Sequence, residues 1–256
     1  MWRRAVQAAL GIVLTATAVA SAAAELRVAV ATNFLAPLQV IAEAFEAEHG
    51  VPVRISAGAT GQHYAQIING APFDVFLAAD QDRPRRLEAD GLAVIGSRMT
   101  YAEGRLVLWA RPGQSLPEAG LAGLASHLSG RLAMANPRLA PYGLAARQAL
   151  EATGQWGAME PSIIQGQNVG QALQYLATGN ASHALVAASY AHRDGRPDGE
   201  WVLLPEDLHA PIRQDAVMLE NAPNPDAARR FLAFLDSDPT HEIMVRFGYR
   251  PPEAAP

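Results

Sequence analysis

The chain has 256 residues, of which half are hydrophobic, and its formal net charge is −5. A chain of this length and composition folds into one large or two small domains with a buried core, and its negative charge, with no basic stripe, argues against a nucleic-acid partner. All 20 strongly basic residues are arginine and cysteine is absent, so P-loop lysines, Schiff-base chemistry, disulfides, thiolate nucleophiles and Cys-ligated metals are excluded.

The N-terminus has the three-part pattern of a secretory signal peptide. Arg3 and Arg4 precede an apolar run, which ends in small residues that offer two A-x-A cleavage sites, at 20–22 and 22–24. The run is shorter than the roughly 20 residues that a membrane span needs, so a retained anchor is the less favoured alternative. We expect residues 1–24 to be removed, which takes the formal charge from −5 to −7 because two arginines are lost, and the mature chain to be exported to a bacterial periplasm.

Downstream of residue 24 the hydrophobic pattern alternates between strands and helices. Strands are predicted at 26–31, 51–58, 73–80, 104–113, 130–137, 161–167, 183–189 and 215–223. Helices are predicted at 34–50, 62–70, 83–91, 141–154, 169–180, 224–237 and 239–248. Strands and helices that alternate in this way predict parallel βαβ units with right-handed crossovers, and therefore an α/β fold.

No catalytic motif accompanies this pattern. The sequence lacks G-x-S-x-G, H-E-x-x-H and a G-x-G-x-x-G after a strand, and its seven histidines form no pair at i, i+2 or i, i+4. Asp74 and Asp80 bracket a strand, but Asp80 is better placed as a helix N-cap than as half of a carboxylate pair. The sequence therefore indicates no enzyme and no histidine metal site.

Four junctions between a strand and the following helix lack charge and offer free backbone N–H groups. They are Thr32-Asn33, Thr60-Gly61, Pro141-Tyr142-Gly143 and Asn168-Val169-Gly170. The first turn of a helix has unsatisfied N–H groups and the positive end of the helix dipole, so it binds an anion without a cationic side chain. One such junction is more often only an N-cap. Four of them, two in each half of the chain, predict an anion site in a cleft between two lobes, beyond the carboxyl ends of the strands.

Several motifs carry a resemblance to a known family. The chain contains, in order, "RVAVATNF", "GAPFDVFLAADQ", "GRLAMANPRLAPYG" followed by "ALEATGQW", "GQNVGQAL" and the tail "FLAFLDSDPTHEIMVRFGY". Together they resemble the ModA family, the periplasmic molybdate-binding proteins that serve molybdate ABC transporters. The similarity extends over essentially the whole mature chain, and the second and third motifs are quite specific in combination.

The resemblance implies the fold and the function. The implied fold is a two-lobed type II periplasmic-binding-protein fold of the α/β class, with a ligand cleft between lobes joined by two hinge strands, near 102–105 and 213–217. One lobe comprises 25–103 and 216–256, and the other 104–215. The implied function is capture of molybdate or tungstate and delivery to the membrane permease of an ABC transporter, by a monomer with no cofactor and no enzymatic activity.

The resemblance also implies the site. The oxyanion ligands fall on Thr32, Asn33, Thr60, Tyr142 and Val169, and no side chain binds molybdenum directly. Val169 would contribute only its backbone N–H. Tyr142 could contribute its hydroxyl, its N–H or both. Some family members have a ligand tyrosine where this chain has Ala187, and the nearby Tyr190 is expected to serve packing instead.

Other functions remain open from the sequence alone. The anion could be sulfate, phosphate or a small carboxylate, because the sequence does not show the size of the cavity. An exported adhesion or sensory domain on the same fold is a second class. An exported hydrolase is the least favoured, since no nucleophile and base are placed together.

Overall fold

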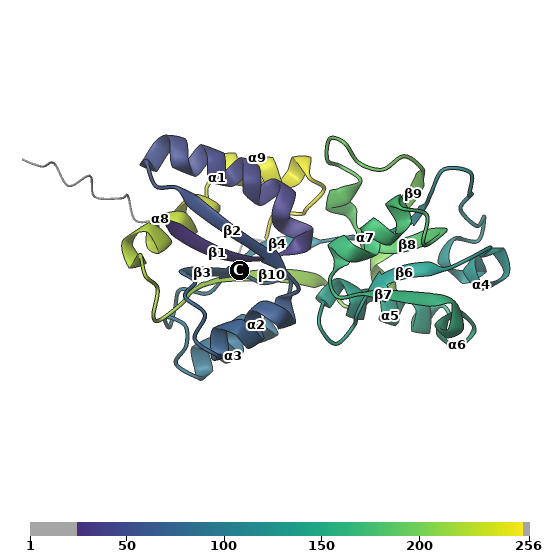
Figure 1. Cartoon of the computed structure of the whole chain (residues 1–256), viewed down its shortest axis with the longest axis horizontal. Coiled ribbons are helices and arrows are strands. Elements are labelled where there is room, and N and C mark those ends of the chain that lie inside the picture. Colours follow the sequence, from purple (N-terminus) through teal and green to yellow (C-terminus); the bar gives the residue numbers. More distant parts are fainter. Residues whose placement is uncertain (1–24, 253–256) are drawn as a thin grey trace, which may run out of the picture.

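The computed structural model describes residues 25–252, and in this range the chain forms two lobes, each built around a five-stranded sheet (Figure 1). The two-lobed α/β architecture confirms the predicted fold class. The predicted signal peptide, residues 1–24, lies outside the described residues. Between residues 25 and 252, no helix combines the length and the apolar character needed to cross a membrane.

The sheet of the first lobe has the strand order β2-β1-β3-β10-β4. Its strands are β1 (Leu26–Ala31), β2 (Val53–Gly58), β3 (Val75–Leu77), β4 (Met99–Gly104) and β10 (Ile212–Met218). β1 runs parallel to β2 and β3, whereas β10 is antiparallel to β3 and β4. Ala31 pairs with Gly58, so the segments that follow β1 and β2 start at the same edge of the sheet.

Helices cover both faces of this sheet (Figure 1). They are the 3-10 turn η1 (Thr32–Phe34) and the helices α1 (Leu35–His49), α2 (Thr60–Ile68), α3 (Asp82–Ala89), α8 (Pro225–Leu235) and α9 (Asp238–Arg246). Alternate residues of β1 point to opposite faces. Val28 and Val30 therefore pack in one cluster with Phe45 of α1 and Phe231 of α8, whereas Ala29 packs in another cluster on the side of α2 and α3.

The sheet of the second lobe has the order β7-β6-β8-β5-β9. Its strands are β5 (Leu106–Ala110), β6 (Leu132–Ala135), β7 (Ile163–Gly166), β8 (His183–Ala187) and β9 (Glu200–Leu203). Its helices and 3-10 turns are η2 (Gly120–Gly123), α4 (Leu124–His127), α5 (Pro141–Ala152), α6 (Trp156–Met159), η3 (Glu160–Ser162), α7 (Val169–Ala177), η4 (Ala188–Tyr190) and η5 (Glu206–Leu208). β6 is parallel to β7 and β8, and the pairing of Ala135 with Gly166 aligns the ends of β6 and β7.

The chain passes between the lobes twice. Arg105 separates β4 of the first sheet from β5 of the second, and residues 204–211 lead from β9 back to β10. The predicted lobe boundaries, 103/104 and 215/216, fall inside β4 and β10, the strands next to these passages. β4 and β10 pair with each other, so both connections lie side by side.

The structure also contains elements that the hydrophobic pattern does not predict. β9, α4 and α6 have four residues each, which is too short for a period to be recognised. β9 lies at the edge of its sheet and follows a turn-rich loop. β10 begins at residue 212, three residues earlier than the predicted 215, because Ile212 and the residues after it pair with β4.

Candidate functional site

The first junction, Thr32-Asn33, forms the 3-10 turn η1 directly after β1. The Asn33 side chain is buried, and its Nδ2 donates to Gln214 Oε1 at 2.7 Å and to Tyr249 Oη at 3.0 Å. Both amide hydrogens are therefore used within the first lobe. The backbone N–H of Asn33, inside the first turn of η1, has no acceptor within that turn and is the group of this residue that can meet a ligand.

The second junction places Thr60 at the first position of α2. Its side chain is buried, and Oγ1 accepts a hydrogen bond from the N–H of Ala79 at 3.1 Å. A hydroxyl has one hydrogen, and since this bond uses the oxygen as acceptor, the hydrogen of Thr60 stays available for donation. Thr60 thus offers two donors, its O–H and its first-turn N–H.

The third junction begins α5 with Pro141, a residue suited to the first helical position because it has no N–H to satisfy. The N–H groups of Gly143 and Leu144 donate to the carbonyl of Ala140, at 2.9 and 3.1 Å. The N–H of Tyr142, which precedes these two, is at the second helical position, where it has no acceptor within the helix. This junction therefore presents one free N–H, that of Tyr142.

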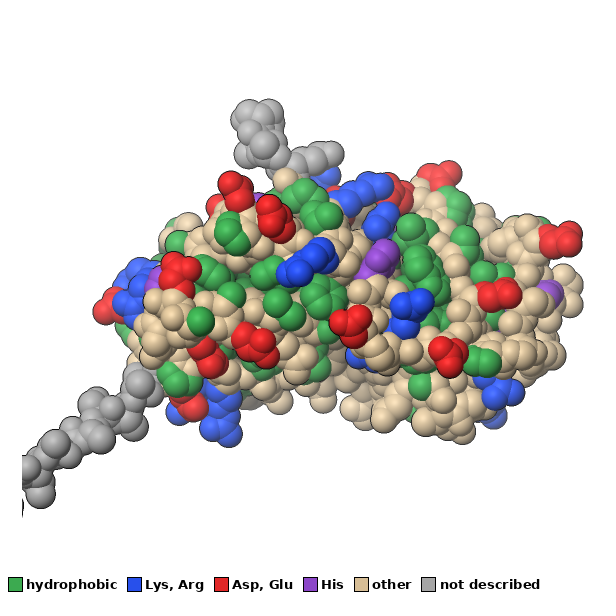
Figure 2. All heavy atoms as spheres, turned by 90° about the horizontal axis from the view of Figure 1, so that it is seen from above, with side chains coloured by type: hydrophobic (Ala, Val, Ile, Leu, Met, Phe, Trp, Pro, Cys, Tyr) green, Lys and Arg blue, Asp and Glu red, His purple; other side chains and the backbone are tan. Residues whose placement is uncertain are grey.

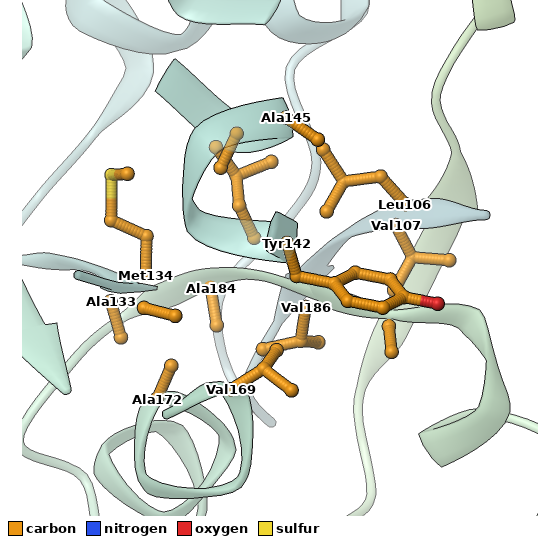
Figure 3. Close-up of a cluster of buried hydrophobic side chains, with 14 of the residues drawn as sticks. Leu106, Val107, Ala133, Met134, Tyr142, Ala145, Val169, Ala172, Ala184 and Val186 are labelled. Atoms are coloured by element: carbon orange, nitrogen blue, oxygen red, sulfur yellow. The ribbon is translucent and has the colours of Figure 1, made fainter. Parts of the chain in front are cut away.

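The Tyr142 side chain is directed away from this N–H. Its ring extends from the start of α5 alongside Leu106 and Val107 (Figure 3). A Cβ atom placed on Gly104 would lie only 2.0 Å from Tyr142 Oη, so the hydroxyl lies against the connection between the lobes. Within residues 25–252 this buried oxygen has no partner with hydrogen-bond geometry, and burial raises the pKa of Tyr142 well above its usual value, which keeps the hydroxyl protonated.

The fourth junction begins α7. Asn168 is the N-cap, and its Oδ1 accepts from the N–H of Gln171 at 2.9 Å. The Val169 side chain packs in the core of the second lobe, near Val186 (Figure 3), while its N–H at the first helical position has no acceptor in the helix. The next N–H, that of Gly170, donates to Thr32 Oγ1 of the first lobe at 3.3 Å.

The structure brings the four junctions together across the contact between the lobes. Besides the bond from Gly170 to Thr32, the N–H of Gly61 donates to the carbonyl of Leu139 at 2.9 Å. The small residues that precede the first-lobe junctions, Ala31 and Ala59, are buried in the same cluster as Tyr142 and Val169 of the second lobe. A cavity of about 190 Å³ is lined by residues of both lobes, such as Asp80 and Ile212 of the first and Pro141 of the second, and Pro141 is the lining residue that belongs to a junction.

The charge next to these junctions is internally balanced. Arg83 of α3 forms an ion pair with Asp80, and its Nη2 donates to the carbonyl of Arg138 at 3.2 Å. Asp80 Oδ1 also accepts from the N–H of Arg83 in the first turn of α3 at 3.1 Å, but the N-cap of α3 is Gln81 and not Asp80, the residue that the sequence predicted. Burial raises the pKa of Asp80, and the neighbouring Arg83 offsets part of that effect. No group of three His, Asp or Glu suited to a metal ion occurs in the part of the chain that the structure describes.

One face of the molecule shows no dominant sign of charge. Acidic and basic side chains are interspersed with apolar ones over the face drawn in Figure 2. An anion that reached the four junctions would therefore be held by local donors at the helix ends rather than by a field of arginines.

Comparison with known proteins assigns the class of the molecule. The family of bacterial extracellular solute-binding proteins matches residues 26–250. The molybdate-binding protein ModA of Azotobacter vinelandii is 45% identical over 234 residues, which cover 91% of this chain and 92% of that protein. ModA of Rhodobacter capsulatus is 39% identical over 246 residues, which cover 96% of each chain. The solved structure of the Azotobacter vinelandii periplasmic molybdate-binding protein superposes with a TM-score of 0.84 at 36% identity, over 90% of this chain and 100% of that one.

The chain therefore belongs to the bacterial extracellular solute-binding proteins, and within them to the ModA family. This confirms the resemblance found in the sequence motifs and the type II periplasmic-binding-protein fold that it implied. The family is a transport class rather than an enzyme class.

Proposed function

We propose that this chain captures molybdate or tungstate outside the cytoplasm and delivers it to the permease of an ABC transporter. The observation that carries the proposal is the pair of hydrogen bonds that joins the first-lobe junctions to the second lobe, from Gly170 to Thr32 and from Gly61 to Leu139. The donors that we propose for the ion are four first-turn N–H groups at these junctions. They belong to Asn33, Thr60, Tyr142 and Val169. The names of the ModA relatives, which cover more than nine-tenths of the chain, support molybdate as the anion.

The chemistry of these donors fits a fully deprotonated tetrahedral oxyanion. Such an ion has only acceptor oxygens, so N–H and O–H donors satisfy it and a carboxylate would repel it. The hydroxyls of Thr32 and Thr60 add two donors, because each oxygen already accepts from a backbone N–H, of Gly170 and Ala79 respectively. Helix ends replace a cationic side chain as the source of positive potential.

Tyr142 and Asn33 take part through their backbone in this proposal. The Tyr142 hydroxyl lies against Gly104 at the connection between the lobes, and the amide hydrogens of Asn33 are already donated to Gln214 and Tyr249. We infer that residues 1–24 are removed and that the mature protein is periplasmic and monomeric. We also infer that it binds no cofactor and catalyses no reaction. Closure of the lobes around the ion would complete the site.

Tyr142→Phe separates the two possible contributions of this residue. We expect molybdate affinity to be unchanged, because the substitution keeps the N–H and removes a buried hydroxyl that has no partner among residues 25–252. The free energy of unfolding should be equal or slightly higher for the same reason. Calorimetric titration with molybdate checks this, and a tenfold loss of affinity would assign the hydroxyl to the ion.

An anion panel tests the proposed specificity. The mature protein, residues 25–256, is titrated calorimetrically with molybdate, tungstate, sulfate and phosphate. We expect tight binding with a stoichiometry of one for molybdate and tungstate, and no saturable heat for sulfate or phosphate. Equal affinity for sulfate would indicate a general oxyanion-binding protein instead. If none of the four anions binds, an adhesion or sensory domain on this fold would be favoured.

A further inference from the structure

Two hydroxyl groups of the second lobe reach the backbone of the Thr32-Asn33 turn in the first lobe. Ser189 Oγ donates to the carbonyl of Asn33 at 2.8 Å, and Tyr190 Oη donates to the carbonyl of Thr32 at 3.0 Å. Both side chains are buried and lie on η4, directly after β8 of the second sheet. The contacts therefore join the two lobes at the turn that supplies ligand donors.

Each of the two carbonyls accepts one bond from each lobe. The carbonyl of Thr32 also accepts from the N–H of Leu35, and the carbonyl of Asn33 also accepts from Tyr249 Oη at 2.7 Å. A carbonyl oxygen has two lone pairs. The bonds from Leu35 and Tyr249 lie within the first lobe, whereas those from Ser189 and Tyr190 join the two lobes and would break if η4 moved away from the turn.

The bond from Tyr190 acts on the peptide group that has the proposed ligand donor. The carbonyl of Thr32 and the N–H of Asn33 belong to one planar trans peptide, so fixing the direction of the carbonyl also fixes the direction of the N–H. A hydrogen bond to the carbonyl also polarises the peptide and strengthens the N–H as a donor. Burial raises the pKa of the Tyr190 hydroxyl, which therefore keeps its proton for this bond.

We infer that Ser189 and Tyr190 are positioning residues of the oxyanion site, which aim the Asn33 N–H at the ion and hold the lobes closed over it. The inference rests on the proposed function, since it concerns how the same site retains its anion. Neither residue touches the ion in this account. Through these two residues, closure of the lobes strengthens the Asn33 N–H as a donor on the opposite lobe.

The test compares variants that remove only these hydroxyls, Tyr190→Phe and Ser189→Ala, with Tyr175→Phe as the matched control. Tyr175 lies on α7 of the same lobe, and its hydroxyl makes no hydrogen bond to residues 25–252. Dissociation of molybdate is followed by stopped-flow tryptophan fluorescence, and the radius of gyration is measured by small-angle scattering with and without molybdate. We expect Tyr190→Phe and Ser189→Ala each to raise the dissociation rate roughly fivefold, with little change in the association rate, and Tyr175→Phe to change neither.

The outcomes separate the inference from the function on which it rests. If the unsubstituted protein binds no molybdate, the proposed function fails. If it binds molybdate but both hydroxyl variants release it at the unsubstituted rate, the inference is overturned. A lower melting temperature of the ligand-free variants with unchanged dissociation would assign these hydroxyls to fold stability alone, and would likewise overturn it. If one variant does not fold, the dissociation rate of the other decides.

Discussion

Thr60→Ala is expected to weaken molybdate binding by about 1–3 kcal/mol, the usual cost of leaving a charged acceptor short of a buried donor. The substitution removes the O–H that points from the first turn of α2, and it also removes the acceptor for the N–H of Ala79. Because both groups are buried, water does not replace them readily. Calorimetric titration of the variant with molybdate gives the change in binding free energy.

Thr60→Ser is the matched control for this prediction. Serine keeps the hydroxyl and loses only a methyl group, so its molybdate affinity should stay close to that of the unsubstituted protein. The melting temperature of each ligand-free variant separates loss of binding from loss of stability, since Ala79 loses its partner whether or not the ion is present. Unchanged affinity in Thr60→Ala would remove the Thr60 hydroxyl from the site.

Gly143→Ala is expected to disturb both stability and binding. A Cβ atom at this position would lie 2.4 Å from the carbonyl oxygen of Ala135 and 2.8 Å from the carbonyl carbon of Asn136. Both are backbone atoms, of the last residue of β6 and of the residue that follows it. Backbone of this kind cannot yield as a flexible side chain would, so the start of α5 must move away from β6. We expect the free energy of unfolding to fall by about 1–3 kcal/mol, the usual cost of overpacking.

The same displacement should reach the ligand. Gly143 directly follows Tyr142, so moving the first turn of α5 also moves the N–H that Tyr142 offers. Molybdate affinity should therefore fall in Gly143→Ala even at temperatures where the protein is fully folded. Gly157→Ala in α6 is the control, because a Cβ there meets open space, and we expect it to be neutral or slightly stabilising. Denaturant unfolding and calorimetry check both variants, and a Gly143→Ala protein with unaltered stability would contradict the close approach of α5 to β6.

The positions of the four junctions could be predicted from the sequence because they depend on local features. Each follows a run of β-forming residues and precedes a segment with helical periodicity, so both the end of the strand and the start of the helix can be predicted. In parallel units the carboxyl ends of strands share an edge, and this places the junctions together without knowledge of the packing. The pairing of Ala31 with Gly58 and of Ala135 with Gly166 realises that rule in each lobe.

The direction of the side chains could not be predicted in the same way. Asn33 donates its amide hydrogens to Gln214 and Tyr249, which lie 181 and 216 residues further along the chain. The Tyr142 hydroxyl meets Gly104 because the two connections between the lobes pass beside α5. Such contacts depend on how β10 and the C-terminal segment return to the first lobe. The local hydrophobic periodicity of the sequence does not predict that return.

Tyr190 packs in the core of the second lobe, as the sequence predicted, and its hydroxyl in addition donates to the carbonyl of Thr32, which was not predicted. One signal in the sequence could have found it. Ser189 and Tyr190 follow β8, a buried strand parallel to β6, so they lie at the same edge of the sheet as Tyr142 and Val169. Polar groups at that edge are candidates for contact with the opposite lobe even when they are not ligands.

The crystal structure of the mature protein with molybdate tests the central claim most directly. We predict one ion at the contact between the lobes, within hydrogen-bond distance of the N–H groups of Asn33, Thr60, Tyr142 and Val169 and of the hydroxyls of Thr32 and Thr60, with Arg83 still paired to Asp80. An ion bound elsewhere, or one held by the guanidinium of Arg83, would contradict a site made of neutral donors.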